Sequence, residues 1–200
     1  MENNKTSDNV FADAFRRHRE VLEASSVSLL LDIQKGAELL TTTLLSGGRA
    51  LTCGNGGSAT DAIHLSGEFL CRYREDRKPF PVTALVTDVA MLTATGNDYS
   101  FEDIFARQVD ALGTKGDILI AFTTSGASKN VLKALEAARA KAMRVIVLTG
   151  AKGESLRSRA DVLVAVPSEE TARVQEMHEL VYHAWCEYFD SEFKAAQRTL

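Results

Sequence analysis

The chain has 200 residues, of which 45% are hydrophobic and 25% are charged, which is the composition of an ordinary globular domain with a sizeable core. Its formal net charge of −4 gives no general attraction to nucleic acid or to an anionic membrane, so neither is an expected partner. The polar start and the lack of a long apolar run argue against a signal peptide and a membrane span, so we expect a cytoplasmic protein.

The first part of the chain is predicted to form two helices. Residues 1–8 are polar and are expected to form a flexible tail. Apolar residues at helical spacing predict one helix over residues 11–22 and a second over residues 27–45, which ends before a pair of glycines. Such a helix pair can cover the sheet of its own subunit or pack against a second subunit, and the spacing leaves both arrangements open.

From residue 49 onward, short runs rich in Val, Ile and Leu alternate with helical stretches. The predicted strands are residues 49–53, 82–86, 117–122, 143–148 and 161–166. This alternation is typical of a parallel sheet covered by helices on both faces. We therefore expect one domain over residues 9–200, a three-layer α/β/α sandwich whose ligands bind beyond the carboxyl ends of the strands, where strand order reverses.

Two loops that follow predicted strands carry groups that suit a phosphate. Residues 54–58 are rich in glycine, which lets the backbone approach a ligand, and residues 123–128 are rich in hydroxyls and precede a predicted helix over residues 130–142. A hydroxyl cluster before a helix can also be a simple N-cap. Neither loop matches a P-loop or a good dinucleotide fingerprint, so we expect no nucleotide cofactor and favour a phosphorylated sugar as ligand.

Acid and base side chains occur on two predicted helices. Asp61, His64 and Glu68 are three and four residues apart, so they share one face of the helix after the first loop. The last helix adds Gln175, Glu176, His178, Glu179 and His183. Side chains of these types bind metals or transfer protons, but the same spacing is common on solvated helix surfaces.

Several other polar residues have simpler interpretations. Asp98 is interpreted as a turn residue or helix cap. Arg72 can pair with Glu68 or hold substrate, and the charged residues 74–78 are interpreted as a solvated turn. The three cysteines contain no CxxC pair, so they are expected to be reduced and buried.

The motifs occur together in the order and spacing of a known family. They are the segment CGNGGS over residues 53–58, Asp61-x-x-His64-x-x-x-Glu68, GND over residues 96–98, TSGxS over residues 124–128, and TARVQEMH over residues 171–178. Over residues 11–189 the chain resembles the phosphoheptose isomerases of the SIS (sugar isomerase) family. The resemblance implies a flavodoxin-like SIS fold and a homotetramer with active sites between subunits. It also implies conversion of sedoheptulose 7-phosphate to D-glycero-D-manno-heptose 7-phosphate for bacterial surface polysaccharide.

The resemblance also implies roles for individual residues. The phosphate cradle would be Thr123, Thr124, Ser125 and Ser128. The sugar would be lined by Asn55, Gly56, Gly57, Ser58, Asn97 and Asp98. One zinc ion per subunit would be held by His64, Glu68, Gln175 and His183. The proton-transfer pair would be Glu68 and His183, supported by Asp61 and Arg72.

Two of these implied roles compete at Glu68, because a carboxylate bound to zinc is a weaker base. We assign Glu68 first to proton transfer and treat the metal as positioning or regulatory. Gln175 and His183 are about 12 Å apart along a helix, so they must straddle one metal or reach it from different subunits.

Two rival functions remain open at this stage. The first is a non-catalytic protein of the same fold that binds a sugar phosphate or associates with the replication initiator. The presence of both Glu68 and His183 favours the enzyme over this rival. The second is an isomerase that acts on another phosphorylated ketose.

Overall fold

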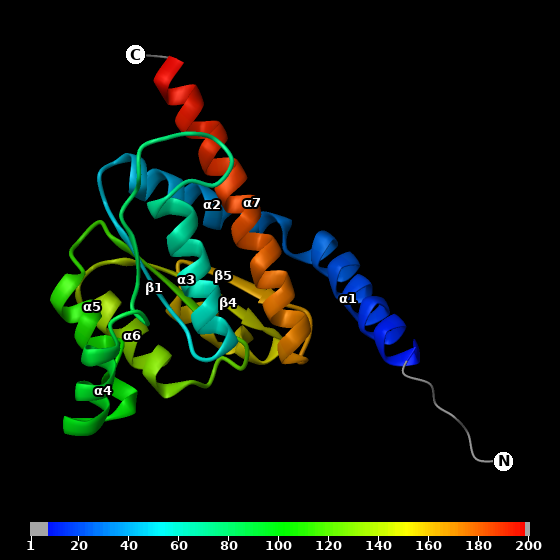
Figure 1. The fold of residues 1–200 in the computed structure, drawn as a ribbon, viewed down its shortest axis with the longest axis horizontal. Coiled ribbons are helices and arrows are strands. Elements are labelled where there is room, and N and C mark those ends of the chain that lie inside the picture. The colour runs from blue at the N-terminus through cyan, green and yellow to red at the C-terminus, as the bar shows by residue number, and fades with distance from the viewer. Residues whose placement is uncertain (1–7, 199–200) are drawn as a thin grey trace.

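Five parallel strands form the centre of the molecule (Figure 1). The computed structural model describes residues 8–198, so the predicted tail lies outside the described residues except for Asp8, the first residue of a helix. The strands lie in the order β2-β1-β3-β4-β5, and every neighbouring pair is parallel. They are β1 (Ala50–Cys53), β2 (Val82–Ala84), β3 (Ile118–Thr123), β4 (Arg144–Gly150) and β5 (Val162–Val166). This is the flavodoxin-like order, which reverses between β1 and β3.

Helices cover both faces of the sheet and confirm the predicted three-layer sandwich. The α-helices are α1 (Asp8–Ser28), α2 (Leu30–Leu45), α3 (Gly57–Leu70), α4 (Val89–Asp98), α5 (Ala106–Leu112), α6 (Lys129–Ala140) and α7 (Thr171–Arg198). Short 3-10 segments are η1 (Phe101–Asp103) and η2 (Ala151–Arg159). Side chains of β3 alternate between the layers: Ile118, Ile120 and Phe122 pack with α2, α3 and α7, whereas Leu119 and Ala121 pack with α5 and α6. Within residues 8–198, no helix has the length and apolar character needed to cross a membrane.

The two N-terminal helices divide at a different residue from the one predicted. The second helix was expected to begin at residue 27, but α1 continues to Ser28 and the chain bends at Leu29. The Ser28 hydroxyl donates to the Ala24 carbonyl at 2.9 Å, a contact that competes with helical bonding and often bends a helix. Leu29 is buried at the bend, and α1 projects away from the sheet (Figure 1).

The charged segment after α3 is exposed at Arg74, Glu75, Asp76 and Lys78, as expected of a solvated turn, but not at Arg77. The Arg77 side chain is only 1% exposed and pairs with Asp190 of α7 at 2.7 Å. Its other nitrogens donate to the carbonyls of Glu68 and Phe69, so Arg77 caps the end of α3 and ties it to α7. The spacing of charges along the sequence could not reveal this contact, because Asp190 lies 113 residues away. The three cysteines were expected to be buried. This is confirmed for Cys53 and Cys186 but is wrong for Cys71, which is exposed at this turn.

Candidate active site

The two loops predicted to bind a phosphorylated ligand meet at the carboxyl ends of β1 and β3. They border a pocket of about 290 Å³ that lies where the strand order reverses. The pocket is lined by Asn55, Gly56, Gly57, Ser58, Phe122, Thr123, Thr124, Ser128, Thr171 and Gln175. The sheet therefore brings together most of the residues that were predicted to contact the sugar and its phosphate.

The glycine turn after β1 allows two close backbone approaches. Gly56 has a φ of +57°, a conformation that residues with a side chain rarely adopt. At Gly57, an added Cβ would lie 2.5 Å from the amide nitrogen of Gln175, so only glycine lets α7 approach α3 at this point. The start of α3 therefore lies directly against Gln175, with its free N–H groups at the pocket.

A reciprocal amide pair joins the glycine turn to the start of α6. The Asn55 amide nitrogen donates to Asn130 at 2.9 Å, and the Asn130 amide nitrogen donates back to Asn55 at 2.8 Å. Asn130 is buried, and its oxygen also accepts from the Val131 backbone. Both amides are thus engaged in holding the two loops together. The sequence interpretation missed Asn130 because an asparagine at the start of a helix ordinarily indicates only a cap.

The hydroxyl loop after β3 presents its groups to the pocket at the start of α6. Ser128 occupies the N-cap position, but its side chain makes no capping hydrogen bond, which leaves the hydroxyl available to a ligand. Ser125 is used differently, because its hydroxyl accepts from the Ala127 backbone. Gly126 has a φ of +69° and packs tightly on Gly153. A Cβ added to Gly126 would lie 2.5 Å from the Cα atom of Gly153. The loop is therefore held by backbone packing, while Ser128 stays free.

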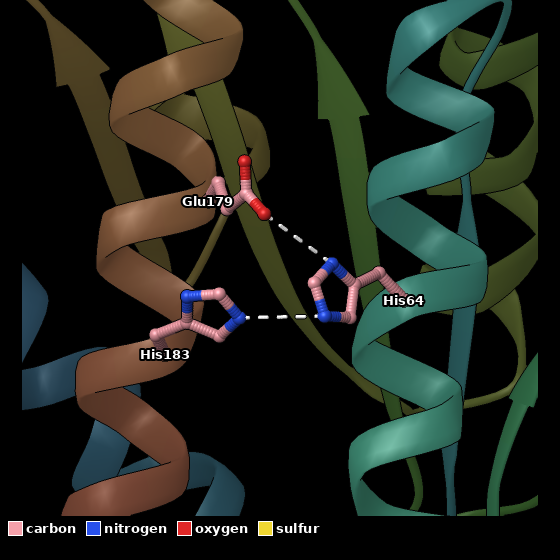
Figure 2. A group of neighbouring side chains, drawn as sticks. All are labelled: His64, Glu179 and His183. Atoms are coloured by element: carbon pink, nitrogen blue, oxygen red, sulfur yellow. Dashed lines mark hydrogen bonds and ion pairs between the residues drawn. The ribbon is translucent and has the colours of Figure 1, made fainter.

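A second group of predicted residues lies farther along α3 and α7, which run side by side (Figure 1). His64 and His183 face each other with their Nε2 atoms 3.4 Å apart, and Glu68 lies 3.1 Å from the same His64 nitrogen. The Tyr182 hydroxyl lies 2.9 Å from the other His64 nitrogen. Figure 2 also shows the Glu179 carboxylate directed at His64, at a distance of 3.5 Å.

This second group has donors suited to a metal ion. One donor atom each from His64, Glu179 and His183 lies within 4.8 Å of the others, and two imidazoles with a carboxylate form a set typical of zinc. Among the four predicted ligands, His64, Glu68 and His183 thus lie close together, whereas Gln175 lines the pocket two helical turns away. The sequence analysis named Glu179 on the last helix but assigned it no role. Its i, i+4 spacing to His183 could have indicated that the two side chains share one face of the helix.

Three other predicted site residues lie apart from the pocket within this chain. Asn97 and Asp98 end α4, where the Asn97 amide donates to the Asp98 carboxylate at 2.8 Å. Asp98 lines a different pocket together with Tyr99 and Arg107. Arg72 is exposed beyond the end of α3 and donates to the Arg74 carbonyl instead of pairing with Glu68. One chain therefore does not bring these three side chains to the pocket.

Asp61 is a buried carboxyl group between α3 and α7. Its Oδ2 atom has no hydrogen-bond partner among the described residues and lies 3.9 Å from the buried ring of His178. Burial, together with the negative charge of Glu179, raises the pKa of Asp61 to about 7. Burial lowers the pKa of His178 to about 4. Both groups are therefore mainly uncharged just below neutral pH, as expected for polar side chains placed in an apolar layer.

We expect Asp61→Asn to become more stable relative to the wild type as the pH rises from about 4 to 7. The pKa of Asp61 is about 7 in the folded chain and 3.8 without burial, so the folded state holds the extra proton in this window. Wild-type stability then falls with rising pH by up to about 1.4 kcal/mol per pH unit from this group. His178 acts in the opposite direction, but the variant retains it.

Urea unfolding of both proteins across this pH range, at the same protein concentration and after EDTA treatment, measures the difference between their free energies of unfolding. A difference that stays constant across this pH range would contradict the buried, protonated state of Asp61.

Comparison with known proteins shows which class of protein has this fold and pocket. The family model for the SIS domain matches residues 14–150. The solved structure of a phosphoheptose isomerase from Neisseria gonorrhoeae is similar, with a TM-score of 0.88 and 40% identity, covering 93% of this chain and 100% of that one. The chain thus contains a SIS domain, whose pocket lies at the strand-order reversal.

Relatives of known sequence narrow the class further. The phosphoheptose isomerase of Helicobacter pylori is 44% identical over 186 residues, which cover 93% of this chain and 97% of the relative. That of Shewanella loihica is 47% identical over 181 residues, covering 89% and 92%. The chain belongs to the phosphoheptose isomerase family.

Proposed function

We propose that this chain is an aldose–ketose isomerase that converts sedoheptulose 7-phosphate to D-glycero-D-manno-heptose 7-phosphate. The observation that carries the proposal is the relation of the pocket to the acid and base side chains. Both α3 and α7 begin at the pocket, and both carry such side chains two to three turns farther along. His64 lies about 10 Å beyond Gly57, and Glu68 and His183 lean back toward the pocket because helical side chains tilt to the N-terminus.

In this arrangement the phosphate binds at one end and the reacting carbons lie at the other. Ser128, Thr124 and the N–H groups at the helix starts hold the phosphate oxygens. An extended seven-carbon chain then reaches along α3 and α7 until C1 and C2 lie between Glu68 and His183. Binding the remote phosphate in this way orients the reacting carbons for proton transfer.

Isomerisation requires one proton to move between carbons and one between oxygens. Glu68 removes a proton from C1 of the ketose, and the electron pair forms the C1–C2 double bond of an enediol. His183 transfers a proton between the two oxygens, and Glu68 then returns its proton to C2, which leaves the aldehyde at C1. His64 and His183, with a neighbouring carboxylate, would hold a zinc ion, which would supply Lewis-acid stabilisation of the developing negative charge.

The test is turnover of sedoheptulose 7-phosphate by the purified chain with zinc supplied, followed by NMR of the product. We expect kcat/KM to be higher for the seven-carbon ketose phosphate than for five- and six-carbon analogues. A higher value for a shorter ketose would assign a different substrate. The absence of conversion for every ketose phosphate would support a non-catalytic binding protein.

We expect Ser128→Ala to raise KM by about 10- to 100-fold with little change in kcat. The hydroxyl makes no capping bond, so the substitution removes a contact to a charged phosphate and leaves α6 intact. Steady-state kinetics measure both constants, and Ser155→Ala, at an exposed position of η2, is the matched control. A loss confined to kcat would exclude Ser128 from the phosphate cradle.

We also propose that the functional unit is a homotetramer with sites at subunit interfaces. Phe11 and Phe15 of α1 are 67% and 73% exposed, as are Leu30 and Leu31 of α2 at 61% and 72%. Apolar side chains of this size are normally covered, and α1 projects from the body of the molecule (Figure 1). An interface would also give Asn97, Asp98 and Arg72 a route to a neighbouring pocket. Light scattering of the purified protein measures the subunit number.

A further inference from the structure

We propose that Asn130 is a positioning residue of the pocket assigned to the sugar phosphate. It makes the capping hydrogen bond of α6 that Ser128 would otherwise make, and it fixes the orientation of the Asn55 amide. Through these two contacts it leaves the Ser128 hydroxyl free for a phosphate and holds the glycine turn, residues 54–57, against α6. The inference rests on the proposed function, because it concerns the same pocket.

The start of α6 shows Asn130 in the role of the cap. Ser128 occupies the N-cap position, from which a serine hydroxyl ordinarily accepts from the backbone N–H two or three residues later. The N–H three residues later is that of Val131, and it donates instead to the Asn130 side-chain oxygen at 2.9 Å. A helix start leaves this N–H without a partner inside the helix, so a side chain must satisfy it where it is buried. Because Asn130 does so, Ser128 is released from capping.

The Val131 hydrogen bond also sets the orientation of two amide groups. It requires an oxygen, so it identifies Oδ1 of Asn130 as the atom next to the helix start. The same oxygen accepts from Asn55 Nδ2 at 2.9 Å, and Asn130 Nδ2 donates to Asn55 Oδ1 at 2.8 Å. Turning either amide over alone would bring like atoms together in both contacts. The backbone of α6 therefore determines, through Asn130, how Asn55 is oriented on the glycine turn.

The glycine turn depends on this pair because it has no other side chain to hold it. Of residues 54–57, all but Asn55 are glycine. Glycine loses more conformational freedom on ordering than any other residue, so such a turn is mobile unless it is tied down. Asn130 is 3% exposed, so water cannot readily replace it as the partner of Asn55. The pair is thus expected to keep the turn in place before the ligand arrives, which lowers the cost of binding.

The release of Ser128 is tested by the cost of Ser128→Ala in different backgrounds. Calorimetry measures the Kd of glucitol 6-phosphate, an open-chain polyol phosphate that lacks the reacting carbonyl. In the wild type we expect Ser128→Ala to raise Kd by about 10- to 100-fold. In Asn130→Ala the freed Val131 N–H takes the Ser128 hydroxyl as its cap. Kd is therefore expected to be at least about 10-fold higher already, and Ser128→Ala to add less than about threefold.

Asn130→Asp is the matched comparison, because a carboxylate of the same shape still accepts from the Val131 N–H. Ser128 then stays free, and Ser128→Ala is again expected to raise Kd at least about 10-fold. The added negative charge weakens phosphate binding, but it is present with and without Ser128→Ala and cancels in the ratio. The hold on the glycine turn is tested by Asn55→Ala, which is expected to raise Kd in the wild type and to add less than about threefold in Asn130→Ala.

Asp117→Ala controls for a general loss of stability. Asp117 is 4% exposed and accepts from the backbone N–H groups of Arg49 and Thr114, at the opposite end of β3 from the pocket. This variant is expected to lower Tm and to leave Kd within about threefold of the wild type. If Asn130→Ala does not fold, Asn130→Leu replaces it with the same expectations, because leucine keeps the volume and lacks the oxygen.

Three outcomes would overturn the proposal. They are an unchanged Kd in Asn130→Ala, an equal cost of Ser128→Ala in the wild type and in Asn130→Ala, and an equal rise of Kd in Asp117→Ala. Turnover of the heptulose phosphate is assayed separately. A chain that binds the polyol phosphate but converts no ketose phosphate would refute the proposed reaction and leave the role of Asn130 intact.

Discussion

Replacing Glu68 with glutamine is expected to lower kcat by about 10²- to 10⁴-fold, which is the usual contribution of general acid–base catalysis. Glutamine has nearly the same size and can still hydrogen bond to His64, which lies 3.1 Å from the carboxylate. It cannot accept a proton from carbon at neutral pH. The fold and the binding of the sugar phosphate at the far end of the helices are therefore expected to persist.

Four measurements separate this role from a structural or metal-binding one. Thermal unfolding and the inhibition constant of a non-reacting sugar phosphate should match those of the wild type. In D₂O, deuterium incorporation at C2 of the aldose should fall in parallel with kcat. Excess zinc should not restore turnover. Restoration by zinc, or a kcat within threefold of the wild type, would contradict the assignment of Glu68 as the base.

Asp190→Ala is expected to destabilise the fold by about 3–5 kcal/mol, because it leaves the buried guanidinium of Arg77 without its partner. Arg77 also lies over the rings of Phe69, Phe80 and Phe189, at 5.2–5.5 Å from their centroids, so it cannot reach water without disrupting this cluster. Urea unfolding at a fixed protein concentration measures the change, since subunit association contributes to stability.

A double substitution tests whether the charge or the packing causes the loss. We expect Arg77→Met combined with Asp190→Leu to recover most of the stability, because no unpaired buried charge remains. A solvated charged turn, the interpretation of the sequence alone, would make Asp190→Ala cost less than about 1 kcal/mol. The free energies of unfolding of the two variants thus distinguish the two descriptions directly.

The layered fold was predictable because local composition and sheet geometry agree. Within the predicted strand 117–122, residues 118–122 are all apolar, which indicates a strand covered on both faces. Every residue of β3 is indeed buried. The position of the bend at Leu29 was not predictable, because the helical pattern is continuous there. The hydroxyls of Ser26 and Ser28 both donate to helix carbonyls just before the bend. Periodicity thus predicted that the helices exist, but not the residue at which they divide.

The sequence by itself determined the fold class, the two loops that border the pocket and the pairing of His64 with Glu68, because periodicity and i, i+4 spacing act over a few residues. Only the tertiary structure decided which distant groups meet. It joined Asn55 to Asn130, Arg77 to Asp190, and Glu179 to His64, at separations of 75, 113 and 115 residues. Such contacts depend on how the helices pack on the sheet, and spacing along the chain carries no record of that packing.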